Sequence, residues 1–297
     1  MLKDNQLLQL AQQRREQIER YWPENIFLPT SEWYHAAKDV MESPEDMIRV
    51  GELSIRGPHR YTRSVYKFDP TLQESLMSTQ LKGDLPCDLL LRLPEWTVFI
   101  DIDEGVYVAL DHTPADAPVP PPVYDETGVL ASPTPITEYE LRILTGEDVA
   151  VIPLGPWSVA EAVDRLIDGL EIDHGRFDVA GAYSRMTYIA ERYLPLIMYI
   201  CSDGVDYPDR ERPQRPQPVR TRRDGWKLFP AKRDRVWKLG ERTGEAIRRG
   251  RRGATHSGRK GPAPHIRRAH WHTLRNGQVK FFPPIPVAQH ATDELCC

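Results

Sequence analysis

The segment 96–110 constrains the fold most. Its two halves, 96–102 and 106–110, are rich in β-branched and aromatic residues, and Asp103-Glu104-Gly105 between them has the composition of a turn. We therefore predict a β-hairpin here, and a further strand at 149–154, where the same residue types recur. A hairpin buries one face only when other elements cover it, so the rest of the chain must supply helices.

A second hairpin is predicted close to the C-terminus. Asn276-Gly277 separates two strand-like runs, 264–275 and 278–282. Asn-Gly between such runs is the strongest short-range hairpin signal. We expect both hairpins to share one sheet.

The helices predicted around this sheet follow from capping residues and apolar spacing. Ser158 and Glu161 form a capping box that starts a helix over 158–170, and the very apolar stretch 180–201 predicts a core helix kinked or broken near Pro195. Asp234 is the predicted cap of a helix ending at Arg249. Further helices are expected at 3–22, from Ser31 onward and after Asp69-Pro70. The predicted class is α+β, a mixed or antiparallel sheet with two hairpins flanked by helices.

Composition narrows the class of protein. The chain has 297 residues, of which 40% are hydrophobic, enough for a core of one large domain or two ordinary ones. No stretch approaches the roughly 18 consecutive apolar residues that a membrane helix needs. The four cysteines lack metal-ligand spacing, so we expect no cofactor. Because the chain has no membrane-spanning run and its cysteines form no disulfide framework, we expect no membrane partner and a cytoplasmic location.

Charge divides the chain in two. Residues 1–208 carry 17 Lys and Arg against 35 Asp and Glu, a net charge of −18, whereas residues 209–280 carry 22 against 6, a net charge of +16. Two interpretations stay open: the two parts attract one another, or the basic part faces a polyanion such as nucleic acid.

These patterns suggest four regions. A helical N-terminal region covers 1–82, and an acidic α+β core covers 83–208. A linker rich in Pro and Arg covers 209–234. A basic helix plus the C-terminal hairpin covers 235–297 and completes the core.

The segment 265–272 carries the most distinctive chemistry. On a strand, Arg268, His270 and His272 share one face, and Arg267 and Trp271 share the other. Two His at this spacing can ligate a metal together with Asp101, which describes a hydrolase-like site, although such histidines more often stack or hydrogen-bond. Arginine and tryptophan here can also recognise a polymer.

Three blocks carry a resemblance to a known family. They are residues 93–102 (LPEWTVFIDI), 237–249 (WKLGERTGEAIRR) and 264–272 (PHIRRAHWH). Their order and spacing resemble the second family of type V-A anti-CRISPR proteins, which phages and plasmids carry, over roughly residues 85–287. The aromatic residues that follow HWH in the family are replaced here by Thr273-Leu274-Arg275, and the Arg-rich linker looks peculiar to this chain.

The resemblance implies a function inside the host bacterial cell. Members lower production of the type V-A CRISPR effector nuclease: they recognise its N-terminal polypeptide as it emerges during translation, and the encoding mRNA is then lost. The implied partner is that polypeptide, with the ribosome or mRNA as a further partner, and no catalytic residue carries over.

The site residues are therefore assigned from their chemistry. The peptide-binding candidates are His265, Arg267, Arg268, His270, Trp271 and His272, with Trp96 and Asp101 from the first hairpin. We expect Arg268 and His270 to bind, Arg268 to pair with a carboxylate such as Asp101, and Trp271 to anchor the core. The RNA- or ribosome-facing candidates are Arg248, Arg249, Arg251 and Arg252. The alternatives are a metal-dependent ribonuclease built on His270 and His272, and a general nucleic-acid-binding protein.

Overall fold

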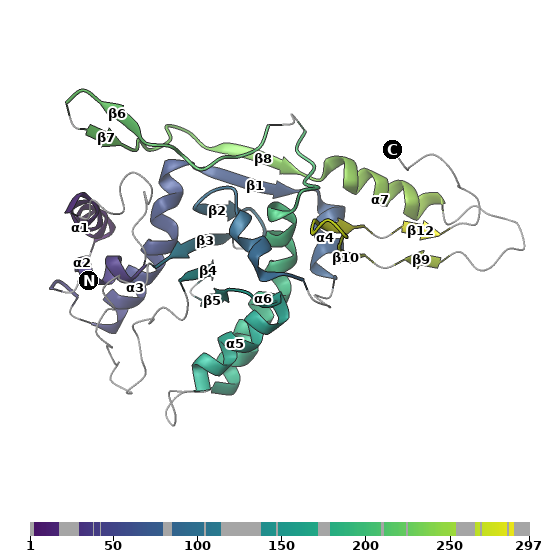
Figure 1. The fold of residues 1–297 in the computed structure, drawn as a ribbon, viewed down its shortest axis with the longest axis horizontal. Helices are drawn as coiled ribbons and strands as arrows, with labels where there is room; N and C mark the ends of the chain where they lie inside the picture. Colours follow the sequence, from purple (N-terminus) through teal and green to yellow (C-terminus); the bar gives the residue numbers. More distant parts are fainter. Residues whose placement is uncertain are drawn as a thin grey trace, which may run out of the picture.

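A six-stranded sheet forms the centre of the molecule (Figure 1). Its strand order is β5-β4-β3-β2-β1-β8; β1 runs parallel to β2 and β8, and β2 to β5 are antiparallel. The strands are β1 (Ser64–Phe68), β2 (Thr97–Ile100), β3 (Val106–His112), β4 (Tyr139–Thr145), β5 (Asp148–Leu154) and β8 (Arg235–Leu239). The sheet is mixed, and with its helices it confirms the α+β class.

The computed structural model describes most of the chain. The described residues are 3–17, 30–37, 39–41, 43–79, 85–103, 105–113, 138–146, 148–171, 179–208, 211–223, 225–253, 265–267, 269–283 and 285–287. The stretch 114–137, which contains Pro120-Pro121-Pro122, lies outside them. Within the described parts, no helix is long and apolar enough to cross a membrane.

The first predicted hairpin is confirmed as β2 and β3. Val98 lies opposite Val108 in the antiparallel register, and both are fully buried on the core face. The chain reverses through Asp103 (φ 45°) and Gly105 (φ 83°), which adopt the left-handed conformation that tight turns require. The predicted strand at 149–154 is also confirmed, as β5.

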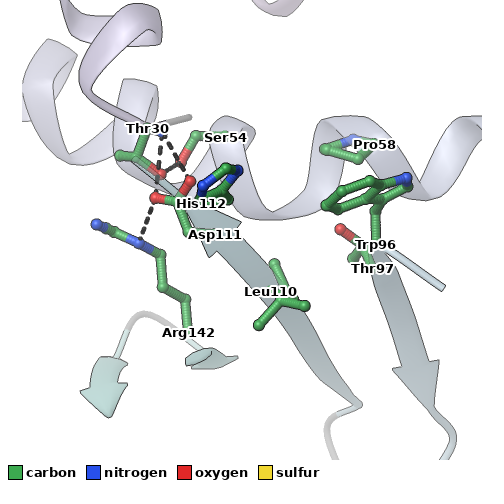
Figure 2. A pocket seen from close by; sticks show the side chains of 10 residues that line it. Thr30, Ser54, Pro58, Trp96, Thr97, Leu110, Asp111, His112 and Arg142 are labelled. Atoms are coloured by element: carbon green, nitrogen blue, oxygen red, sulfur yellow. Dashed lines mark hydrogen bonds and ion pairs between the residues drawn. The ribbon is translucent and has the colours of Figure 1, made fainter. Parts of the chain in front are cut away.

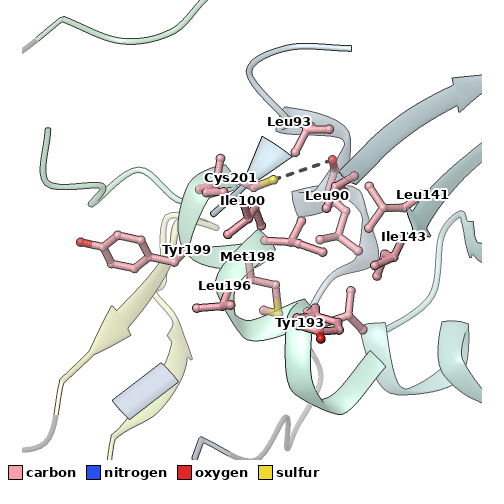
Figure 3. Packing of buried hydrophobic residues seen from close by; sticks show 14 of the residues in the cluster. Leu90, Leu93, Ile100, Leu141, Ile143, Tyr193, Leu196, Met198, Tyr199 and Cys201 are labelled. Carbon is pink, nitrogen blue, oxygen red and sulfur yellow. Dashed lines mark hydrogen bonds between the residues drawn. The ribbon is translucent and has the colours of Figure 1, made fainter. Parts of the chain in front are cut away.

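One face of the sheet is covered by α6 (Val179–Cys201), together with α5 (Val159–Glu171), α4 (Pro70–Met77) and the 3₁₀ segment η3 (Cys87–Arg92). Figure 3 shows residues of α6 such as Leu196 and Met198 packed in one apolar cluster with Ile100 and Leu141 of the sheet. Pro195 lies inside α6 without dividing it, so the helix is continuous.

Local signals explain where the helices of this face begin. Ser158 Oγ accepts a hydrogen bond from the Glu161 amide (3.2 Å), and the Glu161 carboxylate accepts one from the Ser158 amide (2.7 Å), so the capping box of α5 is confirmed. Asp69 caps α4, with Oδ1 accepting from the Thr71 amide at 2.9 Å and Pro70 in the first turn.

The N-terminal helices cover part of the opposite face. They are α1 (Asp4–Gln17), α2 (Thr30–Ala37) and α3 (Pro44–Arg56), followed by the 3₁₀ segment η2 (Gly57–Tyr61). Ile55 of α3 packs against Ala109 of β3 and Leu144 of β4, while β1 and β8 are left outside this second core.

The helix predicted from Asp234 begins later than expected, and this prediction is wrong for residues 235–239. They form β8, in which Trp237 and Leu239 are buried on the core face and Val236 and Lys238 are exposed. This alternation is the period of a strand. The helix α7 (Glu241–Gly253) starts after Gly240, whose φ of 74° ends the strand.

The C-terminal hairpin is confirmed, but it does not share the central sheet. Its strands, β10 (His270–Thr273) and β11 (Val279–Phe282), form a two-stranded sheet of their own, as do β9 (His265–Arg267) and β12 (Ile285–Val287). The hairpin is fixed by side chains instead: Trp271 and Val279 belong to the main core, and Phe281 packs on Tyr199 of α6 with ring centroids 6.1 Å apart.

The segment predicted as a linker contains a short hairpin. Within residues 209–234, β6 (Val219–Thr221) and β7 (Gly225–Lys227) pair antiparallel. Figure 1 shows this hairpin projecting past the end of the central sheet where β8 begins.

Gly244 provides a test of how α7 is docked. A Cβ at this position would lie 1.9 Å from Asp69 Oδ1, so alanine must displace the carboxylate that caps α4 and pairs with Arg248. We expect Gly244→Ala to lower the free energy of unfolding by about 2 kcal/mol in urea titrations. Gly204→Ala is the matched control, because nothing lies within 4 Å of its added methyl group. Equal stabilities for the two variants would contradict this docking.

Candidate functional site

Two of the three sequence blocks meet at a buried carboxylate. Glu95, 3% exposed, accepts hydrogen bonds from Ser64 Oγ (2.7 Å) and from the Tyr66 hydroxyl (3.2 Å). Ser64 Oγ in turn accepts one from Trp237 Nε1 at 3.1 Å. Glu95 precedes β2, Ser64 and Tyr66 lie on β1, and Trp237 lies on β8, so this network joins three neighbouring strands through their side chains.

Burial perturbs the acid at the centre of this network. Desolvation raises the pKa of Glu95 to about 7, although the hydrogen bonds from Ser64 and Tyr66 act in the opposite direction. The pKa of the Tyr66 hydroxyl is also raised, chiefly by burial and then by the adjacent Glu95. Near neutral pH the carboxyl is therefore close to half protonated.

The Glu95 network holds β8 at one edge of the sheet, where no described strand pairs with its outer side. Arg235 donates its amide to the Arg63 carbonyl (3.0 Å), and the Leu239 carbonyl accepts from the Asp69 amide (2.8 Å). In a strand the backbone groups alternate in direction, so the N–H and C=O groups of Val236 and Lys238 face away from β1. No strand within the described residues pairs with that side.

Exposed side chains lie beside this open edge. Val236 is 49% exposed and lies next to Val65 in the parallel register, and Lys238 lies next to Lys67. Lys67 Nζ forms an ion pair with Asp101 at 2.6 Å, and both side chains are about half exposed. The edge thus offers an apolar position followed by a basic one.

The opposite edge of the sheet is less open. In β5, Pro153 has no N–H to donate, and its carbonyl accepts from Trp157 Nε1 at 3.1 Å. The chain around Pro86 and Ser158 forms a bridge beside this strand, and α5 packs on it. On the β8 side, the described chain adds one backbone contact just beyond the strand, from the Gly240 amide to the Asp206 carbonyl at 2.9 Å, and no described strand pairs with Val236 or Lys238.

The third sequence block places its residues on two faces of the C-terminal hairpin. Trp271 is 8% exposed, with its ring 5.2 Å from that of Phe281, which confirms the predicted core position. On the other face, His270 stacks on Phe282 at 5.4 Å and is partly buried, whereas His272 is exposed. The two imidazoles therefore share a face, as the strand pattern predicts.

The remaining peptide-binding candidates are dispersed. Trp96 is partly buried beneath the Arg215 guanidinium, 4.5 Å from the ring centroid, and it is not part of the main core that contains Trp271. Asp101 pairs with Lys67, and the partner predicted for it, Arg268, lies outside the described residues. His265 and Arg267 belong to β9, where only their backbone is described.

The arginines of α7 are engaged within the protein. Arg248 Nη1 donates to both Asp69 oxygens at 2.9 and 2.8 Å, Arg249 pairs with Glu245 at 3.0 Å, and Arg251 pairs with Glu74 at 3.1 Å. The side chain of Arg252 lies outside the described residues. Arg248 and Arg251 thus show the attraction between the acidic and basic parts that the charge division left open, whereas Arg249 pairs within α7.

Figure 2 shows a polar pocket between the sheet and the N-terminal helices. Asp111 of β3 accepts from the Thr30 amide (3.2 Å) and forms an ion pair with Arg142 of β4 (3.0 Å), which also pairs with Glu140 (2.6 Å). Burial lowers the pKa of Arg142, but the two carboxylates outweigh it and raise the pKa overall. The cavity measures about 20 Å³, room for about one water molecule. The hydrogen bond from Thr30 to Asp111 ties the start of α2 to the sheet.

The next question is whether the described residues contain a candidate metal site. No group of three or more His, Cys, Asp or Glu there is arranged to hold a metal ion. His270 and His272 share a face, but each lies against the Phe282 ring, with centroid distances of 5.4 and 6.1 Å.

From the sequence, we did not single out the buried acids Glu95 and Glu140, nor the strand β4 that carries Arg142. Glu95 stands in Pro94-Glu95-Trp96, where a carboxyl beside a buried strand was the available signal. Residues 139–145 partly alternate polar and apolar side chains, which is a strand pattern, but the ion pair that buries Arg142 involves Asp111, which is distant in sequence.

Two comparisons identify the class of protein to which this architecture belongs. The anti-CRISPR type V subtype A2 family, termed AcrVA2-like, matches residues 66–289, which include all three sequence blocks. A crystal structure of AcrVA2 has the same fold, with 17% sequence identity, 96% of each chain covered and a TM-score of 0.61. No curated protein matches the chain. The chain therefore belongs to the AcrVA2-like family of type V-A anti-CRISPR proteins.

The buried Glu95 predicts a pH-dependent stability. Because its pKa is raised, its contribution is fully present below the ordinary value of 4.5 and is lost as the pH rises through about 7. Glu95→Gln mimics the protonated acid and does not titrate. We expect its unfolding free energy, relative to the parent, to increase by about 3 kcal/mol from low pH to pH above 7.

Glu161→Gln is the matched control. Glu161 is exposed, and hydrogen bonds from Ser158 lower its pKa, so its carboxylate stays ionised above its ordinary pKa. Its difference from the parent must stay constant over the range in which the Glu95→Gln difference grows, as measured by urea unfolding at several pH values. A pH-independent effect of Glu95→Gln would contradict the raised pKa.

Proposed function

We propose that this anti-CRISPR protein lowers biogenesis of the type V-A CRISPR effector by binding its N-terminal polypeptide as that polypeptide emerges during translation, after which the mRNA is lost. It acts as a peptide-binding protein in the host cytoplasm and does not itself cleave RNA. Membership of the AcrVA2-like family supports the target system. The open edge of β8 supports the binding mode.

The outward backbone groups of Val236 and Lys238, with which no described strand pairs, carry the proposal. An extended peptide gains main-chain hydrogen bonds when it adds a strand to a free sheet edge, and a polypeptide that has just emerged has not yet buried its own backbone. β8 presents Val236 and Lys238 to such a peptide and is five residues long. The buried Glu95 network keeps this strand in register, so the edge exists before the ligand arrives.

Side chains beside the edge supply sequence preference. A strand added next to β8 places its side chains beside those of Val236 and Lys238, 49% and 65% exposed. Cross-strand pairs favour an apolar residue beside valine and an acidic one beside lysine. The peptide preferred by this edge therefore alternates apolar and acidic residues on one face. His270 and Arg268, in the third block, stay proposed as further contacts.

Val236→Pro tests the edge directly. Proline removes the outward N–H of Val236 and leaves the β1 pairing intact, since proline is tolerated in edge strands where the N–H faces solvent. We expect the variant to fold and its affinity for a synthetic effector N-terminal peptide to fall by at least about tenfold in fluorescence anisotropy.

Val236→Thr is the control, because it keeps the shape of valine and its backbone N–H. It should bind within a few-fold of the parent. If the proline variant melts at the parental temperature and binds the peptide normally, the β8 edge is not the site.

The dependence on the polypeptide has its own test in cells. An effector gene recoded with synonymous codons keeps the peptide and changes the mRNA, whereas a frameshifted N-terminus does the reverse. We expect the recoded gene to stay silenced and the frameshifted gene to escape, with effector and mRNA levels as the readout. Silencing that is lost on recoding would favour direct reading of the RNA.

A further inference from the structure

We propose that residues 219–233, here called the basic arm, form a binding surface for single-stranded RNA. The arm contains the β6–β7 hairpin and the chain that leads into β8. It carries six Lys and Arg against one Asp. This surface precedes the β8 edge in the chain and concerns RNA and not the peptide. The RNA proposal can therefore be wrong while the proposal of peptide binding holds.

Five of the six cations of the arm are described in full, and among the described residues they have no carboxylate partners of the kind that α7 has. Arg220, Arg222, Arg223, Lys232 and Arg233 are exposed, and none of them forms an ion pair with another residue of the described ranges. By contrast, the described arginines near the C-terminal end of α7 are all paired to carboxylates. Exposed, uncompensated cations on one segment are the electrostatic footprint of a polyanion site.

The arm also exposes apolar surface among these charges. Phe229 is 59% exposed and Val219 57%, two of the four large hydrophobic side chains described as exposed. Bases stack on aromatic rings while neighbouring cations contact the phosphates, and this combination is typical of single-stranded nucleic acid binding. An acidic protein partner would satisfy the cations but gives no comparable reason for an exposed phenylalanine, so we favour RNA.

The arm is held in place at its base. The Ala231 amide donates to the Arg60 carbonyl at 3.1 Å, Leu228 is buried, and Asp234 pairs with Arg63 at 2.7 Å. The hairpin beyond this base projects past the sheet (Figure 1). Pro218 precedes the hairpin and Pro230 follows it, which limits extension of the ladder.

The test uses the full-length protein and a fluorescein-labelled oligouridine. Affinity is measured by anisotropy at several salt concentrations for the parent and for the triple variant Arg220→Ala, Arg222→Ala, Arg223→Ala. We expect the triple variant to bind at least about tenfold more weakly. Its plot of log affinity against log salt should be less steep by about 2 units, because each phosphate contact on single strands contributes about 0.7.

A charge-matched control separates the arm from net charge. The variant Arg242→Ala, Arg249→Ala, Arg251→Ala removes the same three charges from exposed positions of α7 and should bind RNA nearly as the parent does. Phe229→Ala tests stacking and should weaken RNA binding about tenfold with little change in salt dependence. Equal losses for the arm and α7 variants would overturn the proposal.

Two further readouts keep the conclusion specific. Binding of polyglutamate but not oligouridine would assign the arm to an acidic protein and overturn the RNA site. The arm variant should still bind the synthetic effector peptide, whereas Val236→Pro should still bind oligouridine. Loss of RNA binding in Val236→Pro would contradict the separation of the two surfaces.

Discussion

The placement of β8 against β1 is the constraint on which the rest of the structure depends. Its pairing is parallel and joins segments about 170 residues apart, so no local turn holds it. Three buried contacts do so instead: Trp237 to Ser64, Ser64 to Glu95, and the Leu239 carbonyl to the amide of Asp69. A carboxyl buried at the centre of such a network is costly unless every oxygen is satisfied, and both oxygens of Glu95 are.

Several residues of the blocks that carry the family resemblance have structural roles near β8. Gly240 adopts a left-handed φ and packs against Leu72, Gly244 leaves room for Asp69, and Trp271 fills the core beneath the C-terminal hairpin. These residues hold β8, α7 and the hairpin around the end of β1. The positions left for recognition are the exposed ones beside them, above all the edge of β8.

Local sequence signals predicted the local elements. The β2–β3 hairpin, the capping box at Ser158 and the Asp69 cap each depend on residues within a few positions of one another, and each is confirmed. The family and the α+β class also followed from the sequence. The parallel pairing of β8, the strand β4 and the separate sheet of the C-terminal hairpin did not, because each depends on partners distant in sequence.

The candidate site was predictable only in part for the same reason. The shared face of His270 and His272 and the buried Trp271 follow from strand alternation. For the arginines of α7, sequence cannot show that Asp69 lies against Arg248 and Glu74 against Arg251. The exposed cations at 220–223 were assigned to a linker, since three-residue strands leave little pattern to detect.

Amide hydrogen exchange of β8, measured with and without the effector N-terminal peptide, shows whether the peptide pairs with this strand. Arg235 and Trp237 direct their amides to β1, so these amides should be protected in both states. We expect the amides of Val236 and Lys238 to exchange rapidly in the free protein and to become protected when the peptide binds. Peptide binding that leaves these two amides in rapid exchange would contradict it.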